Sequence, residues 1–470
     1  MEEKRNLIKN TIIITIGKLS TQIVSFLLLP LYTAKLTTEE YGTFDYMHTL
    51  CVFLLPVITL LMEESMFRFL IDSKSKENQE KVITQSVIYI LSSSIVFCIG
   101  IFIILNIVNY EYNLIFLIYI ISSILITLSN ALSRGLSKIK LYSICNLISG
   151  VMTIVLNIIT IVYFKMGIIG LLLSSIIANL TISIVVFTKI NIRQYLSLKR
   201  LEKNLMSTMV KYSIPLIPNS LAFSIINISD RIIVTNMLGS GENGIYSVAY
   251  KFPNIISAFY GFFSIAWKES ASKVVEQEDS NNYYNDVYLS MKKIMFFVSL
   301  CLIAIMPIAF PILVNSEYQE AYIHIPILII ATYFCNMSMF IGGIFIAHKD
   351  TKTIGTTTIA AALINVVFNI LVINIIGLYA ASISTLIANI FLYLYRKYKV
   401  KKYIVFETDI KIIQWIILIL ILISYIINNI YLNIVTLFVT IFCSYYFNKG
   451  LIVDILKKVT NKIHRRNNSC

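Results

Sequence analysis

The sequence predicts an all-α membrane protein of about 14 transmembrane helices, arranged as two parallel six-helix repeats followed by two C-terminal helices. Three observations predict this class. Of the 470 residues, 57% are hydrophobic and only 14% are charged, whereas soluble proteins carry about 25% charged residues. Apolar runs of roughly the 20 residues that cross a bilayer follow one another, separated by short polar breaks. Segments far apart in the chain also match each other at nearly one offset.

The apolar runs define the predicted helices in order. A bilayer core offers no water to backbone groups, so without alternating strand patterns these runs must be helices. Their approximate bounds are 11–32, 43–62, 82–106, 114–133, 142–164, 168–188, 212–236, 244–267, 292–314, 321–346, 355–374, 378–395, 412–428 and 431–447.

The basic residues alternate between the loops of this map. Segments on the side of the N-terminus carry 34 of the 39 Lys and Arg residues, whereas the opposite loops carry only Lys35 and Lys165. The positive-inside rule therefore predicts that both termini are cytoplasmic. Because these loops account for the net charge of +14, we expect no nucleic acid partner. The basic tails suit contact with anionic membrane lipids.

An internal repeat predicts the domain organisation. A shift of 202 residues aligns 36–44 with 238–246, and a shift of 210 aligns 174–180 with 384–390. Six crossings separate the copies and restore the original side, so the copies must be parallel. The predicted parts are an N-lobe (1–188), a basic cytoplasmic linker (189–211), a C-lobe (212–398) and helices 13–14 with a basic cytoplasmic tail (399–470).

Ionisable side chains inside the spans are the candidate functional residues. Each costs about 2.5–3.5 kcal/mol at mid-membrane, so it normally faces protein or water. The candidates for binding an anionic substrate are Lys18, Arg231, Lys251 and His48, and those for ion coupling are Asp45, Asp230 and Glu64. Snorkelling near helix ends and structural ion pairs are the alternatives. Asp230 and Arg231 need not pair with each other, because helix neighbours point about 100° apart.

Prolines interrupt four predicted helices that form equivalent pairs in the repeat: Pro30 in the first, Pro56 in the second, Pro215 and Pro218 in the seventh, and Pro253 in the eighth. Each removes an intrahelical hydrogen bond and bends its helix. Pro30, Pro215, Pro218 and Pro253 are therefore candidate hinges for a rocking motion. Simple fitting of helix shape is the alternative.

Enzymatic motifs are absent from the sequence. It contains no GxxxxGK[ST], HExxH, paired CxxC or GxSxG pattern, so we expect no catalytic residue, bound metal or organic cofactor. The predicted outer loops are too short to carry the catalytic groups of a membrane polysaccharide polymerase or glycosyltransferase. That enzyme class is the alternative to a transporter.

Several segments resemble the polysaccharide flippases of the MOP superfamily. They are Glu40-Tyr41-Gly42-Thr43-Phe44, Tyr212-Ser213-Ile214-Pro215-Leu216-Ile217-Pro218, Ser229-Asp230-Arg231 and Gly244-Ile245-Tyr246-Ser247-Val248-Ala249-Tyr250-Lys251. The resemblance implies a non-enzymatic flippase of the bacterial cytoplasmic (inner) membrane. Such a protein translocates undecaprenyl-pyrophosphate-linked oligosaccharide repeat units by alternating access, for O-antigen of lipopolysaccharide, capsule or another envelope polysaccharide.

The resemblance also implies the roles of individual residues. Lys18, Arg231 and Lys251 would contact pyrophosphate or acidic sugars, and Asp45 and Asp230 would couple transport to H⁺ or Na⁺. A polymerase and other envelope-assembly proteins would be partners. The alternatives within the superfamily are a lipid II flippase and a multidrug antiporter, the latter usually with twelve helices.

Overall fold

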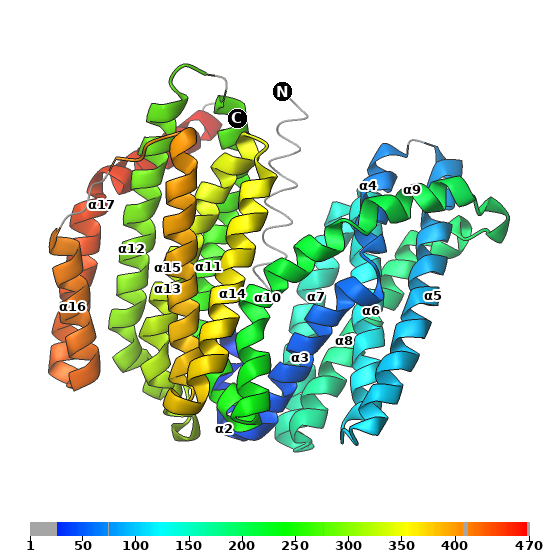
Figure 1. The fold of residues 1–470 in the computed structure, drawn as a ribbon, viewed down its shortest axis with the longest axis horizontal. Helices are drawn as coiled ribbons and strands as arrows, with labels where there is room; N and C mark the ends of the chain where they lie inside the picture. Colours follow the sequence, from blue (N-terminus) through cyan, green and yellow to red (C-terminus); the bar gives the residue numbers. More distant parts are fainter. Residues whose placement is uncertain (1–25, 74, 276, 408–411, 468–470) are drawn as a thin grey trace. The chain divides into compact units, whose positions relative to one another are not determined.

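A computed structural model describes residues 26–73, 75–275, 277–407 and 412–467, which form helices joined by short connections (Figure 1). The described residues contain no β-strand. The chain divides into two compact units, Met1–Ser247 and Val248–Cys470. This division falls inside α11 (Ser240–Val274) and separates compact units, whereas the predicted boundary at 189–211 separates sequence repeats. The predicted domain bounds therefore stay a prediction. The predicted all-α membrane fold class is confirmed.

The first unit is built around α3, α6 and α8. Helix α6 packs against α4 and α8, while α3 packs against α8 and α10. The helices of this unit are α2 (Leu29–Lys35), α3 (Thr38–Ile58), α4 (Met62–Asp72), α5 (Lys76–Ile107), α6 (Asn113–Gly135), α7 (Ile139–Asn157), η1 (Ile158–Tyr163), α8 (Gly167–Ile190), η2 (Ile192–Tyr195), η3 (Leu198–Arg200), α9 (Lys203–Ser213), α10 (Leu216–Met237) and the first turns of α11 (Ser240–Val274).

The second unit is built around α12, α13 and α15. Helix α15 packs against α13 and α14, and α12 packs against α13, α16 and α17 (Figure 1). The elements of this unit are the remainder of α11, then α12 (Ser280–Leu313), η4 (Ser316–Tyr318), α13 (Ala321–Ala347), α14 (Thr351–Ile376), α15 (Tyr379–Lys399), η5 (Val400–Lys402), α16 (Ile412–Ile427) and α17 (Ile430–Asn467).

Every predicted span after the first coincides with helix in the described residues. Nine helical segments in this part of the chain are long and apolar enough to cross a bilayer. Helices α10, α11 and α15 occupy three further predicted spans and carry the charged residues Arg231, Lys251 and Arg396. Most of the first predicted span, 11–32, lies outside the described residues.

Helix α3 begins at a reciprocal cap that the sequence encodes. The Thr37 hydroxyl accepts a hydrogen bond from the Glu40 backbone N–H at 3.1 Å, and the Glu40 carboxylate accepts one from the Thr37 N–H at 3.1 Å. This pattern satisfies two donors that a helix start otherwise leaves unpaired. The adjoining turns of α3 then contact the start of α11, where the Asn243 side-chain amide donates to the Gly42 carbonyl at 2.8 Å.

The second and seventh predicted helices are both interrupted. Leu60 and Leu61 separate α3 from α4 with φ angles of 52° and 51°, a left-handed conformation that costs a non-glycine residue about 1–2 kcal/mol. Pro215 separates α9 from α10, and Pro218 lies in the first turn of α10, where a missing N–H costs little.

The other two candidate hinge prolines sit differently. Pro30 lies in the first turn of α2, whereas Pro253 lies inside α11, which continues on both sides of it. Whether any of these prolines acts as a hinge stays a prediction.

The basic linker at 189–211 is ordered and belongs to the first unit. The Thr84 hydroxyl on α5 donates to the Tyr195 carbonyl at 2.8 Å. The Arg200 guanidinium lies 2.5 Å from the Glu77 carboxylate, also on α5. In Figure 1, α9 (green) is inclined to α5 and α6, and α9 packs against α4. The linker therefore follows the surface of the first unit.

Candidate functional site

An ion pair between a buried carboxylate and a partly buried guanidinium joins α3 to α10. The Arg231 Nε lies 3.2 Å from the Asp45 Oδ2, and the Arg231 Nη1 donates to the Thr49 hydroxyl at 3.3 Å. Asp45 and Thr49 are one helical turn apart, so they present their side chains on the same face of α3. Asp45 is 6% exposed and Thr49 is 1% exposed. Two residues predicted separately, one for ion coupling and one for substrate binding, thus form one buried contact.

The chemistry of this pair follows from its burial. A charge inside a membrane protein is expensive unless it has a partner, so each group of the pair needs the other or a substitute. A proton on Asp45 would remove the negative partner, and an anionic ligand at Arg231 would replace it. The guanidinium suits such a ligand, because its fork of donors matches phosphate oxygens. Arg231 can therefore change partner, from the Asp45 carboxylate to an anionic ligand.

Asp230 makes a separate contact with α11. The Tyr246 hydroxyl donates to the Asp230 Oδ2 at 3.0 Å, and the two residues are 1% and 3% exposed, respectively. Asp230 and Arg231 are adjacent in sequence, yet they reach different helices, as expected from the angle between helix neighbours. These two residues therefore tie α10 to both α3 and α11 within the first unit.

His48 connects α3 to α6. Its Nδ1 lies 2.8 Å from the Tyr119 hydroxyl, and its ring stacks on that of Phe44 with centroids 6.3 Å apart. Tyr119 is buried, whereas His48 is exposed on the surface of the unit. His48 is one helical turn from Asp45, so it lies near the ion pair along α3. A substrate-binding role for His48 stays a prediction.

Glu64 pairs with an arginine that the sequence analysis had assigned to a cytoplasmic loop. The Arg134 Nη2, at the end of α6, lies 3.3 Å from the Glu64 Oε1, and the Arg134 guanidinium lies 4.7 Å from the centre of the Phe67 ring. Arg68, one turn further along α4, instead pairs with Asp72 at 2.7 Å. The pair at Glu64 links α4 to α6.

Glu63, next to this pair, is the more deeply placed carboxyl. It is 5% exposed, and α4 follows the apolar span that ends at Ile58. Burial raises the pKa of Glu63 to about 7, and the neighbouring Glu64 charge adds to this, although backbone and Thr59 hydrogen bonds and the Arg134 charge oppose it. The sequence analysis named its neighbour Glu64, but not Glu63, as a candidate.

The remaining two predicted cations are Lys251 and Lys18. Lys251 lies on α11 in the second unit, where it is partly exposed. Lys18 lies outside the described residues. Their predicted cooperation with Arg231 therefore stays a prediction.

A buried arginine in the second unit escaped the sequence analysis. Arg396 is 5% exposed on α15, although its position one residue beyond the predicted span at 378–395 suggested a loop cation. Its three nitrogen atoms donate to neutral acceptors: the Thr357 hydroxyl at 3.2 Å, the Ser338 carbonyl at 3.0 Å and the Thr358 hydroxyl at 2.9 Å. Helical spacing from the polar residues Thr385 and Asn389 would have placed Arg396 on the same face.

Comparison with known proteins relates the chain to one family and one fold. A family of polysaccharide biosynthesis proteins matches residues 7–267, a region that contains the Asp45–Arg231 pair. An uncharacterised membrane protein of Methanocaldococcus jannaschii is 24% identical over 305 residues, covering 61% of this chain and 71% of that protein.

Two solved structures illustrate the likeness in fold. The lipid II flippase MurJ, in an inward closed conformation, has a TM-score of 0.69 at 16% identity, covering 95% of this chain and 100% of that chain. An inward-facing multidrug resistance MATE family transporter of the MOP superfamily has a TM-score of 0.66 at 15% identity, covering 83% and 98%. At such low identity these structures establish the fold alone.

Proposed function

This chain belongs to the polysaccharide biosynthesis protein family and has the fold of MOP-superfamily transporters, and on that premise we propose that it flips lipid-linked oligosaccharides. The proposed substrates are undecaprenyl-pyrophosphate-linked repeat units, moved from the inner to the outer leaflet by alternating access. The products would feed O-antigen, capsule or another envelope polysaccharide. The membrane would be the bacterial cytoplasmic membrane, with both termini inside and a polymerase among the partners.

The buried Asp45–Arg231 contact is the observation that carries this proposal. A lipid-linked sugar presents its charge at the pyrophosphate, so its carrier needs a cation that is available inside the bilayer. Arg231 lies on α10, and its Nε lies 3.2 Å from the Asp45 carboxylate. Charge-assisted bonds from arginine to phosphate oxygens are among the strongest in proteins. Pyrophosphate would therefore compete with Asp45 for the guanidinium.

This competition supplies a route for ion coupling. A proton or Na⁺ taken up at Asp45 would neutralise the carboxylate and make Arg231 available to the pyrophosphate. Loss of that ion would restore the ion pair and favour release of the substrate. Binding of the ion and binding of the pyrophosphate would then be linked through this pair.

Two related transport functions are the competitors. Similarity to the lipid II flippase extends over 95% of the chain and that to the MATE transporter over 83%. The larger coverage supports a flippase with helices beyond the twelve usual in antiporters, and α16 and α17 are such helices. The MurJ likeness keeps lipid II as a second candidate substrate, which also carries a lipid pyrophosphate.

Reconstituted transport tests the proposal. Purified protein would be placed in liposomes that contain fluorescent undecaprenyl-pyrophosphate-linked oligosaccharide, and the rate of substrate appearance in the outer leaflet would be measured. Arg231→Ala should lower this rate at least tenfold, and Arg231→Lys should retain part of it. Asp45→Asn should transport without responding to an imposed proton or sodium gradient. Mass spectrometry should find the transported substrate chemically unchanged.

The controls separate the proposal from its competitors. Arg68→Ala removes an exposed arginine of the same unit that pairs with Asp72, and it should transport at the wild-type rate. Parallel liposomes with lipid II or a cationic drug should show little transport. A wild-type rate in Arg231→Ala would refute the proposed site, and preferential transport of lipid II or drug would replace the proposed substrate.

A further inference from the structure

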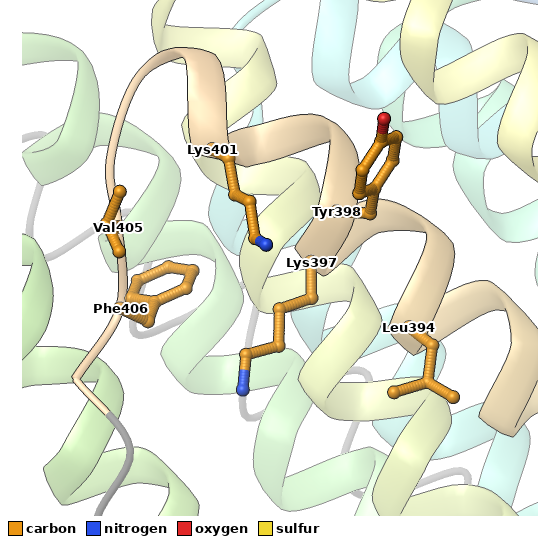
Figure 2. Close-up of a pocket in the computed structure, with 6 residues that line it drawn as sticks. All are labelled: Leu394, Lys397, Tyr398, Lys401, Val405 and Phe406. Carbon is orange, nitrogen blue, oxygen red and sulfur yellow. The ribbon is translucent and has the colours of Figure 1, made fainter.

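A cavity of about 490 Å³ lies at the end of α15, within the second unit. None of its lining residues belongs to the Asp45–Arg231 pair, and the proposed transport does not use it. Figure 2 shows the residues that line it: Leu394, Lys397, Tyr398, Lys401, Val405 and Phe406. Its volume falls within the range of about 300–1,000 Å³ typical of small-molecule sites.

The polar part of the cavity carries two positive charges. Lys397 and Lys401 are one helical turn apart and line the same space (Figure 2), so their charges repel each other. Burial lowers the pKa of Lys397, and the Lys401 charge lowers it further. Among the described residues neither lysine forms an ion pair, whereas the neighbouring Lys402 Nζ lies 2.6 Å from the Asp350 carboxylate. An anion between the two lysines would relieve their repulsion.

Aromatic rings hold these two lysines in place. The Lys397 Nζ lies 6.0 Å from the centre of the Tyr393 ring, and the Lys401 Nζ lies 5.8 Å from that of Tyr398. Cation–π contacts of this kind favour a defined position of the ammonium group. The positive end of the cavity is thus organised by the protein before any ligand binds.

The rest of the cavity is apolar and open to the surroundings of the unit. Leu394 is 55% exposed, Tyr398 65% and Val405 70%. The ring of Phe406, by contrast, is buried and stacks on Tyr288 with centroids 4.0 Å apart. An apolar surface beside paired cations matches an amphiphile with an anionic head, rather than a free inorganic anion, which would leave the apolar part uncovered.

We propose that this cavity binds an anionic phospholipid, with its phosphate between Lys397 and Lys401 and its acyl chains along Leu394 and Val405. The predicted topology puts 396–411 at the cytoplasmic face, where anionic lipids and basic residues attract each other. The cavity binds anionic phospholipids in preference to neutral ones, whereas the pyrophosphate of the transported substrate binds at the Asp45–Arg231 pair.

Lipid binding to the full chain tests this proposal. Purified protein in detergent would be titrated with phosphatidylglycerol or phosphatidylcholine and studied by native mass spectrometry and thermal unfolding. Phosphatidylglycerol should bind more tightly than phosphatidylcholine and raise the melting temperature. Lys397→Gln/Lys401→Gln should weaken phosphatidylglycerol binding about 25-fold, since each lysine near an anionic lipid contributes roughly fivefold. Lys397→Arg/Lys401→Arg should keep most of the binding.

The matched control removes two neighbouring charges that do not line the cavity. Lys399→Gln/Lys352→Gln should bind phosphatidylglycerol as the wild type does, and Val405→Asp should weaken binding without loss of either lysine. Equal binding of the two lipids by wild type, or unchanged binding by Lys397→Gln/Lys401→Gln, would overturn the proposal. Displacement of phosphatidylglycerol by inorganic pyrophosphate at a similar concentration would also overturn the proposal, because it would show that the cavity binds a free anion without the acyl chains.

Discussion

Gly42 on α3 and Gly244 on α11 face each other at a crossing where each helix fills the space a side chain would need. A methyl group on Gly42 would overlap the Ser240 carbonyl oxygen, and one on Gly244 would overlap the Thr38 carbonyl oxygen. A shift of 202 residues, which aligns Gly42 with Gly244, also aligns Thr38 with Ser240. Equivalent residues of the two repeats therefore make reciprocal contacts, the signature of a local two-fold relationship.

Alanine at either glycine should destabilise this crossing. Gly42→Ala and Gly244→Ala should each lower the free energy of unfolding by at least about 2 kcal/mol, because the obstructing atoms belong to backbone and cannot rotate away. Thermal unfolding of the purified protein measures the change. Gly100→Ala, on α5 with no atom within 4 Å of the added methyl group, should be neutral or slightly stabilising. An unchanged melting temperature in Gly42→Ala would show that the helices do not approach this closely.

The Asp45–Arg231 pair should show coupling in a double-mutant cycle. Asp45→Asn or Arg231→Gln alone leaves a buried charge without its partner and should destabilise the protein by at least about 1 kcal/mol. The double variant removes both charges and should be less destabilised than the sum of the two single variants. Unfolding by denaturant in detergent measures the change in the free energy of unfolding for each of the three variants relative to wild type. Strict additivity would contradict the contact, since independent sites do not couple.

Glu63 should make stability fall as the pH rises. Its pKa in the folded protein is raised to about 7, above the ordinary value near 4.3. Between these two pH values the unfolded state therefore binds fewer protons than the folded state. The folded state therefore loses stability progressively between about pH 4.5 and pH 7, and the loss is constant above. Glu63→Gln should be more stable than wild type at pH 8 and similar at pH 4.

Glu64→Gln is the matched control for this pH dependence. It removes the partner of Arg134 but leaves Glu63 buried, so the wild-type slope between pH 4.5 and pH 7 should persist. Melting temperatures across this range provide the test. An identical slope in wild type and Glu63→Gln would exclude Glu63 as its source.

Arg396 should tolerate an apolar replacement better than a conservative one. Lysine keeps the buried charge but offers one ammonium group where the guanidinium reaches three acceptors. Methionine removes the charge, and the Thr357 and Thr358 hydroxyls still donate to Thr353 and Ile354 carbonyls at 2.7 and 2.8 Å. Arg396→Met should therefore have the higher melting temperature of the two variants. The reverse order would show that the charge itself stabilises the unit.

Local patterns explain which parts of the fold could be predicted. Apolar runs marked the helices, and Pro215 marked the break before α10. Each of these signals lies within a few residues of the feature it specifies. The left-handed leucines at 60 and 61 were not predicted, because neither residue type favours that conformation and the surrounding packing imposes it.

The candidate site was predictable as a set of residues, but not as a set of contacts. Asp45 and Arg231 stood out because charges are rare inside apolar spans, and nothing in the sequence indicated that they would pair. Arg134 and Arg396 were missed because each follows a predicted span directly, where a basic residue resembles an ordinary loop cation. The burial of Arg396 and the partial burial of Arg134 became visible only when α15 and α6 extended past the predicted ends.

The sequence by itself determined that this chain is a helical membrane protein with related halves, because hydropathy and repeat offsets are properties of residue order. It also determined that Gly42 and Gly244 are equivalent. Only the tertiary structure decided that these glycines touch and that Arg231 pairs with Asp45. The physical reason is that such contacts depend on the rotation and separation of packed helices, which arise from many side chains at once.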